Sequence, residues 1–301
     1  MDSVQAVNEG LQRRNAVAHI LIAGLGDLGW PLAVHWRDAG HRVSGIRRRN
    51  EGPEGVDLYT GDLNEGAVLL PPDRVDLVYI ILTPGERSEQ GYSRAFLGAP
   101  QRLLDQLGQQ QPLPPVVFVS STAVYGDDEA EVDEDTPPSP QRYNGRILLA
   151  AEEEISIRSL ATVVRFSGIY GPDSQRLVRQ AEAIHDGEEP PALRWSNRIH
   201  RTDCVRLLAR LGEDWLAGEM QPSLVVGTDG HPVLNYEVLN WLGDQLGRPL
   251  ELPLNGPPAG KRVRSRYIEE LDFELRYPDY RAGYSALLSN RGKEQEARGK
   301  E

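Results

Sequence analysis

Cysteine is almost absent from the sequence: among 301 residues, Cys204 stands alone. A single cysteine excludes an intramolecular disulfide and a metal cluster built from thiolates, and it fits a reducing compartment. We expect Cys204 to be a small core residue and not a nucleophile, and we expect no metal site.

Long apolar runs are also missing. LVYIIL at 77–82 is among the longest, far short of the roughly 18 residues that suggest a bilayer span. No basic-then-apolar leader opens the sequence, so we expect a soluble, cytoplasmic protein with no membrane partner.

Positive charge is in deficit, because 33 Lys and Arg stand against 45 Asp and Glu, a formal net charge of −12. A protein that coats nucleic acid needs clustered positive charge, so we expect no nucleic-acid partner. A local basic segment can still hold a small anion. KRVRSR at 261–266 is one candidate for a phosphate or carboxylate group of the substrate, with an ordinary solvated surface as the alternative.

Short apolar segments alternate with helical patterns along most of the chain. The candidate strands are AHILIAG at 18–24, RVSGI at 42–46, VDLVYIIL at 75–82, PVVFVSS at 115–121, TVVRF at 162–166 and SLVVG at 223–227. Helices are indicated by LAVHWRDAG at 32–40 and by the apolar stripe of Phe96, Leu97, Leu103, Leu104 and Leu107. Near-continuous apolar strands separated by such helices predict an α/β fold with a doubly wound parallel sheet.

The predicted domain boundaries lie where the alternation of apolar strands and helices stops. We expect a flexible N-terminal extension at 1–17, a nucleotide-binding core at 18–171 to which 199–229 returns, and a flexible tail at 291–301. Residues 172–198 and 230–290 are rich in Pro, Gly and charge, and we predict that they form a smaller substrate-side cap. The helices near 91–109 and 142–158 can either form a dimer face or lie against the sheet, so the sequence is compatible with a monomer and with a homodimer.

A glycine-rich turn, GLGDLG at 24–29, joins the first strand to the first helix. Gly24 permits the tight turn, Gly26 lets the backbone approach a pyrophosphate, and Gly29 allows close helix packing. The helix N-terminus supplies amide donors and the positive end of a dipole, so Asp27 and Leu28 count among the candidate cofactor-binding residues. The strand, turn and helix in this order predict a Rossmann-type dinucleotide site.

The second strand ends in GIRRRN at 45–50, where an NAD-specific site usually presents an acidic residue to the ribose hydroxyls. A guanidinium of Arg47 or Arg48 can clamp a 2′-phosphate through two hydrogen bonds, whereas a carboxylate would repel it. The sequence therefore favours NADP(H) over NAD(H), with an ordinary basic surface turn as the alternative.

These motifs and several later ones resemble the extended short-chain dehydrogenase/reductases, the NAD(P)-dependent epimerase/dehydratase superfamily, and especially its atypical branch. The resemblance runs over roughly 18–285 and rests on GLGDLG, GDL at 61–63, SSTAVYG at 120–126, DEDTPPSPQRY at 133–143, RFSGIYGP at 165–172 and RIHRTD at 198–203. It implies that Asp62 and Leu63 contact the adenine. Thr83, which follows the strand candidate at 75–82, completes the expected cofactor-binding set.

The resemblance also implies a catalytic serine, a tyrosine that transfers a proton, and a lysine four residues later that lowers the tyrosine pKa. Ser121 and Tyr143 match the first two positions, but Ile147 stands in place of the lysine. A tyrosine with an unperturbed pKa near ~10 is a poor base at neutral pH without a nearby positive charge. Since residues three apart share a helix face, Arg146 is the candidate substitute.

Each of these residues also has a purely structural interpretation. Ser121 can cap a buried strand end, Tyr143 can be an amphipathic core residue, and Arg146 can be solvated. His200 could aid a proton transfer, but a hydrogen-bonded structural histidine is the more ordinary role.

Two functions follow from the sequence. The first is an NADP(H)-dependent oxidoreductase or epimerase/dehydratase-like enzyme that acts on a carbonyl or secondary alcohol of a small molecule, with a sugar derivative as one candidate. The second is an NADP(H)-binding sensor or regulatory protein with little catalysis. The Ser121 and Tyr143 pattern favours the enzyme, and the missing lysine favours the sensor.

Overall fold

A computed structural model of the chain describes residues 16–127, 131–172, 176–270 and 273–298, and it describes side chains as far as residue 289. The expected N-terminal extension at 1–17 lies outside the described residues apart from its last two. In the expected tail at 291–301, the described backbone continues the last helix as far as Arg298.

The chain forms two compact units. The first comprises Met1–Val124, Pro138–Arg165 and Val205–Val225, and the second comprises Tyr125–Pro137, Phe166–Cys204 and Val226–Glu301. Among the described residues, no helix combines the length and the apolar character that a bilayer crossing needs.

A seven-stranded sheet forms the framework of the first unit, in the order β11-β7-β5-β4-β1-β2-β3. Its strands are β1 (His19–Ala23), β2 (Arg42–Arg47), β3 (Asp57–Thr60), β4 (Leu77–Ile80), β5 (Val116–Ser121), β7 (Ala161–Phe166) and β11 (Leu224–Gly227). β1 pairs in parallel with both β2 and β4, so the strand order reverses between β1 and β4. This order confirms the predicted Rossmann-type α/β fold, and such a reversal is where open parallel sheets bind nucleotides.

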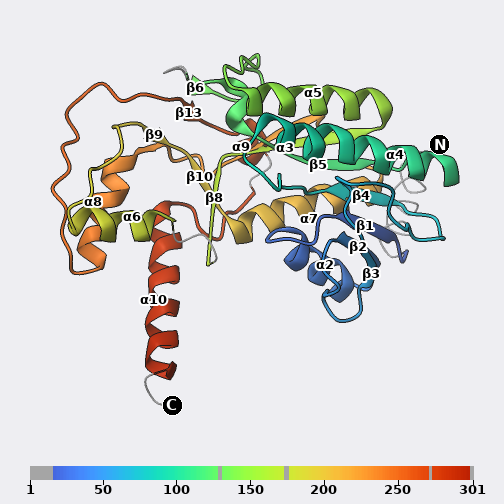
Figure 1. Cartoon of the computed structure of the whole chain (residues 1–301), viewed down its shortest axis with the longest axis horizontal. Helices are drawn as coiled ribbons and strands as arrows, with labels where there is room; N and C mark the ends of the chain where they lie inside the picture. Colours follow the sequence, from blue (N-terminus) through green and yellow to red (C-terminus); the bar gives the residue numbers. More distant parts are fainter. Residues whose placement is uncertain (1–15, 128–130, 173–175, 271–272, 299–301) are drawn as a thin grey trace. The chain divides into compact units, whose positions relative to one another are not determined.

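Helices pack on both faces of this sheet (Figure 1). They are α2 (Gly29–Asp38), α3 (Glu89–Ser93), the π-helical turn η1 (Arg94–Gly98), α4 (Ala99–Gln110), the 3₁₀ turn η2 (Thr122–Tyr125), α5 (Tyr143–Arg158) and α7 (Arg201–Ala217). α3, η1, α4 and α5 pack together on one face. On the other face, a Cβ added at Gly212 of α7 would lie 1.9 Å from Tyr79 Oη and 2.6 Å from Trp36 Cζ2. α2 and α7 therefore share a tightly packed layer over β4.

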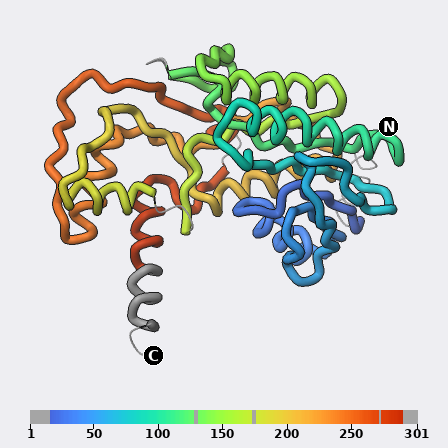
Figure 2. Tube along the Cα trace, viewed as in Figure 1, coloured from blue at the N-terminus to red at the C-terminus, as the bar shows by residue number. Residues whose placement is uncertain are grey.

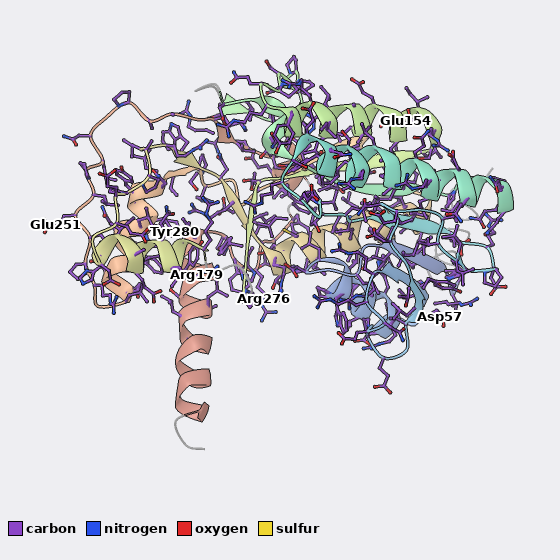
Figure 3. The ribbon with its side chains drawn as sticks, in the orientation of Figure 1. Asp57, Glu154, Arg179, Glu251, Arg276 and Tyr280 are labelled. Atoms are coloured by element: carbon purple, nitrogen blue, oxygen red, sulfur yellow. The ribbon has the colours of Figure 1, made fainter. Side chains whose placement is uncertain are left out.

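Every predicted strand of the large sheet is present, with one addition to that sheet. Of the predicted apolar stripe, Phe96, Leu103, Leu104 and Leu107 are buried and Leu97 is half-buried. The addition is β3, an edge strand whose four residues are exposed or half-buried; Asp57, at its start, is labelled in Figure 3. An edge strand with a solvated face lacks the continuous apolar run that marks the interior strands.

The second unit is built from small strand pairs and helices. Its elements are β6 (Glu131–Val132), β8 (Gly168–Tyr170), α6 (Arg176–His185), β9 (Trp195–Ser196), β10 (Arg198–His200), β12 (Val233–Leu234), α8 (Asn235–Gln245), β13 (Arg262–Val263), α9 (Arg266–Glu270) and α10 (Tyr280–Arg298). Tyr236, Leu239 and Tyr284 belong to its buried core. Between α8 and β13 the chain takes a long path without helix or strand (Figure 2).

One boundary differs from the predicted division. Tyr125–Pro137 belongs to the second unit, although it lies within the core range expected from the sequence. β6 pairs in parallel with β13, and Glu134 accepts hydrogen bonds from the backbone amides of Val226 and Arg266 at 2.9 Å each. These long-range contacts have no local sequence signal, because their partners lie about a hundred residues away.

Candidate cofactor and active site

The glycine turn of the first unit has a separate steric reason for each glycine. Gly24 has φ +110°, and a Cβ there would lie 1.9 Å from Ile81 O. A Cβ at Gly29 would lie 2.0 Å from Gly24 O, so α2 packs directly on the turn. Nothing lies within 4 Å of the position of a Cβ on Gly26. Gly24 and Gly29 are thus needed by the fold, whereas Gly26 leaves open space beside the backbone.

The N-terminus of α2 faces this space without a side-chain cap. Its N-cap residue, Leu28, makes no side-chain hydrogen bond to the helix and is buried, while Asp27 is exposed. The amides of Gly24 and Leu25 donate to Ile46 O at 3.0 and 3.3 Å, which ties the turn to β2. Uncapped amides at a helix N-terminus attract anions.

Two arginines flank the turn at the end of β2. Arg47 Cζ lies 5.3 Å from the centroid of the Trp30 ring, and Arg47 Nη1 donates to Glu51 O at 2.6 Å. Arg48 is exposed, and its Nη1 lies 3.9 Å from the position of a Cβ on Gly85. Gly85 follows β4, and β1 lies between β2 and β4. Arg48 therefore comes close to the segment that follows β4.

The other expected cofactor-binding residues follow neighbouring strands. After β3, Asp62 Oδ1 accepts from Asn64 N at 3.0 Å, and Leu63 is buried. Arg102 of α4 donates to Leu63 O at 2.7 Å and thereby anchors this loop. Thr83 is exposed in the segment that follows β4. The structure thus brings the expected set to the carboxyl edge of β1, β2, β3 and β4.

The serine and the tyrosine also lie in the first unit. Ser121 is the last residue of β5, and its hydroxyl accepts from Ala123 N at 3.2 Å. Tyr143 is the first residue of α5, and its hydroxyl donates to Arg87 O at 2.8 Å. A Cβ at Gly145 would lie 2.5 Å from Ala123 O, so the start of α5 packs directly on the turn after Ser121.

Arg146 does not bond to the phenol in this conformation. It is exposed, and its Nη1 donates to Gln141 O at 2.9 Å. Ile147, at the position of the absent lysine, is buried. The ring of Tyr92 meets Tyr143 edge-on, with centroids 5.6 Å apart. The sequence pattern did not indicate the roles of Tyr92 or Arg87, because both contacts depend on how the segment after β4 folds onto α5.

A buried ionic network connects the elements that carry Ser121 and Tyr143. Arg165 of β7 donates from Nη2 to Glu152 Oε2 at 2.6 Å and from Nε to both carboxylate oxygens at 3.1 Å. Ser120, the neighbour of Ser121, donates to Glu152 Oε1 at 2.5 Å. Each of the three residues is 5% exposed. The network joins β5, α5 and β7; a charged residue inside the apolar segment TVVRF was its only sequence signal.

His200 and Cys204 lie in the second unit. His200 is buried, its Nδ1 accepts from Thr202 N at 3.2 Å, and its ring lies 3.9 Å from that of Tyr277. Burial lowers the pKa of His200 to about 4 and raises that of the Cys204 thiol. A neutral, packed histidine and an inert buried thiol match the structural roles.

The basic segment at 261–266 lies in the second unit, and two of its cations are in ion pairs. Arg264 pairs with Glu131 at 3.2 Å, and Arg266 pairs with Asp135 and with Glu270. These two arginines of the segment thus contact the acidic stretch around β6, while Lys261 donates to Gly126 O and Arg262 lies over the Trp195 ring.

Comparisons with known proteins agree with this architecture. Protein YeeZ of Escherichia coli (strain K12) is 28% identical over 281 residues, covering 86% of this chain and 96% of YeeZ. YtcB of Bacillus subtilis (strain 168), an uncharacterized UDP-glucose epimerase, is 28% identical over 228 residues, covering 68% of each chain. A solved structure of a candidate NAD-dependent epimerase/dehydratase from Methylobacillus flagellatus is 33% identical with a TM-score of 0.77, covering 92% of this chain and 99% of that one.

The profile of one enzyme family matches most of the first unit and continues into the second. It spans residues 20–222, from β1 to the segment before β11. This range contains the glycine turn, both arginines, Ser121 and Tyr143. The chain belongs to the NAD dependent epimerase/dehydratase family.

Proposed function

We propose that the chain is an NADP(H)-dependent enzyme that acts on a secondary alcohol or carbonyl of a sugar nucleotide, as an epimerase, a dehydratase or a reductase. The observation that carries the cofactor choice is the pair Arg47 and Arg48 beside the glycine turn, where an acidic residue would select NAD(H). The substrate class rests on the similarity to YtcB, which is named as an uncharacterized UDP-glucose epimerase.

The residues of the first unit fit a dinucleotide. Open space beside Gly26 and the uncapped start of α2 suit a pyrophosphate, which accepts hydrogen bonds from backbone amides. Asp62, Leu63 and Thr83 would line the rest of the site. When bound, the dinucleotide accepts a hydride from an alcohol carbon or returns one to a carbonyl carbon.

The protein contributes proton transfer and polarisation. The Ser121 hydroxyl already accepts from Ala123 N, so its own hydrogen remains available to a substrate oxygen. The Tyr143 hydroxyl must leave Arg87 O before it exchanges a proton with the substrate, since its single hydrogen is donated there. Arg146 stays in this proposal as a source of positive charge; to reach the phenol it must change rotamer and give up Gln141 O.

Cofactor titration tests the nucleotide assignment. NADPH should bind at least about tenfold more tightly than NADH, a preference of roughly 1.4 kcal/mol. Arg47→Asp should abolish that preference. Arg42→Ala is the matched control, because Arg42 stands at the opposite end of β2 and pairs with Asp57 and Asp73; it should leave the ratio unchanged. Equal affinities in the native protein would overturn the assignment.

A second experiment tests the chemistry. With NADP⁺ and a set of UDP-sugars, Tyr143→Phe should lose about 10²–10⁴-fold in turnover because the proton donor is gone. Tyr92→Phe is the control, since it keeps the neighbouring ring and removes a different hydroxyl. Full activity of Tyr143→Phe would refute the role of the phenol. Tight NADPH binding without turnover of any UDP-sugar would instead support a sensor.

A further inference from the structure

An exposed tryptophan immediately follows the glycine turn. Trp30 is the second residue of α2 and is 36% exposed, whereas Trp36 of the same helix is 1% exposed. Large aromatic side chains are mostly withdrawn from solvent in folded proteins. Trp30 therefore leaves apolar surface in water at the point where the fold binds its nucleotide.

The guanidinium of Arg47 lies over this ring. Its Cζ is 5.3 Å from the Trp30 centroid, a distance at which a cation and an indole face attract each other. Its Nη1 also donates to Glu51 O at 2.6 Å. Among the described residues, Glu51 O is the hydrogen-bond acceptor of this guanidinium, and a guanidinium carries five N–H donors. Arg47 is thus held by two contacts while most of its donors stay available.

We propose that Trp30 is a specificity-determining residue: it holds the Arg47 guanidinium in place for the 2′-phosphate of the cofactor. This inference rests on the proposed NADP(H) function. A free arginine side chain loses rotamer entropy when it grips a phosphate, and a partner that fixes it beforehand removes part of that cost. Because the phosphate is absent from NADH, the contribution of Trp30 appears only with NADPH.

Two other roles for Trp30 predict different results. If the indole touched the adenine or the pyrophosphate, its loss would weaken NADPH and NADH equally, because both cofactors carry these groups. If it only covered the surface of α2, neither affinity would change. The ratio of the two affinities therefore separates the positioning role from both alternatives.

The experiment measures dissociation constants for NADPH and NADH in Trp30→Leu and Trp30→Phe, and repeats them with adenosine 2′,5′-bisphosphate and 5′-AMP as probes of the phosphate alone. An exposed cation–π contact corresponds to about a two- to fivefold change in affinity. Trp30→Leu should weaken NADPH and the bisphosphate by about that factor and leave NADH and 5′-AMP unchanged. Trp30→Phe, which keeps a weaker π face, should fall between Trp30→Leu and the native protein.

Two controls complete the test. Trp195→Leu removes a tryptophan that lies under Arg262, with Cζ 5.6 Å from the centroid, in the second unit; its NADPH to NADH ratio should equal that of the native protein. In an Arg47→Ala background, Trp30→Leu should cause no further loss of NADPH affinity, because the residue through which it acts is gone.

The failures are distinguishable. A native protein that binds both cofactors equally overturns the proposed NADP(H) assignment. A native protein that prefers NADPH and loses this preference in Arg47→Ala, but keeps it in Trp30→Leu, overturns only the role of Trp30. Parallel losses of NADPH and NADH also overturn it. Unchanged NADH binding in Trp30→Phe confirms that the site is folded, should Trp30→Leu fail to fold.

Discussion

Removing the carboxylate of Glu152 should destabilise the protein far more than removing a surface carboxylate. Glu152 receives three hydrogen bonds from Arg165 and one from Ser120, and the side chains of Glu152 and Arg165 are each 6% exposed. In Glu152→Ala the buried guanidinium of Arg165 loses this carboxylate. Breaking a buried pair in this way costs about 3–5 kcal/mol. Since folded proteins are stable by only about 5–15 kcal/mol, a large share of the stability would be lost.

A matched control involves the same helix α5, which carries both Glu152 and Arg158. Asp105 of α4 pairs with Arg158 of α5, but its side chain is 53% exposed. An exposed ion pair contributes about 0–1 kcal/mol, so Asp105→Ala should have little effect. Urea unfolding, followed by circular dichroism and tryptophan fluorescence, gives the free energy of unfolding for both variants and the native protein.

The double variant Glu152→Leu/Arg165→Met separates charge from packing. It removes both charges and fills the space with apolar side chains, so most of the stability lost in Glu152→Ala should return. A loss below about 1 kcal/mol in Glu152→Ala, equal to that in Asp105→Ala, would refute the view that the pair is desolvated. Because Glu152 shares α5 with Tyr143, and Ser120 adjoins Ser121, folded Glu152→Gln should also show weaker catalysis.

Four further substitutions test other parts of the structure. Gly24→Ala should prevent stable folding because the added Cβ would lie 1.9 Å from Ile81 O. Gly26→Val should have the thermal unfolding midpoint of the native protein, because nothing lies within 4 Å of its Cβ position, yet it should fail to bind NADPH in a titration. Asp203 is buried and accepts two backbone amides at 2.8 and 3.0 Å, so Asp203→Ala should lower the free energy of unfolding in urea by about 2–6 kcal/mol. Burial raises the pKa of Asp229 to about 7, so the folded state holds this proton more tightly than the unfolded chain does. The stability that protonated Asp229 contributes is then present below about pH 4 and lost as the pH rises to about 7. Across this range the urea unfolding midpoint should fall less in Asp229→Asn than in the native protein. An equal fall in both proteins would contradict the raised pKa of Asp229.

The order of apolar strands and helices in the sequence was enough to predict the sheet, because interior strands of a parallel sheet are buried on both faces and must be apolar throughout. Gly24 and Gly29 could also be predicted from the sequence motif. Gly24 has a positive φ, and the backbone packs so closely on Gly29 that no side chain fits there. The edge strand β3 was not predicted from its own residues, because a half-solvated strand carries no such constraint. The interior strands and the two glycines could be predicted because each depends on local geometry, which residues close in sequence determine.

Only the tertiary structure decided which partner each polar side chain meets. Arg146 shares a helix with Tyr143, yet it bonds to Gln141 O while the phenol bonds to Arg87 O. Arg47 was predicted as a phosphate ligand, but its packing on Trp30 depends on how α2 lies against β2. Long side chains have several rotamers of similar energy, and the choice among them is made by groups distant in sequence. Residue types along the chain therefore determined the fold and were enough to nominate the candidate site residues, whereas the contacts of these residues were determined by packing between elements.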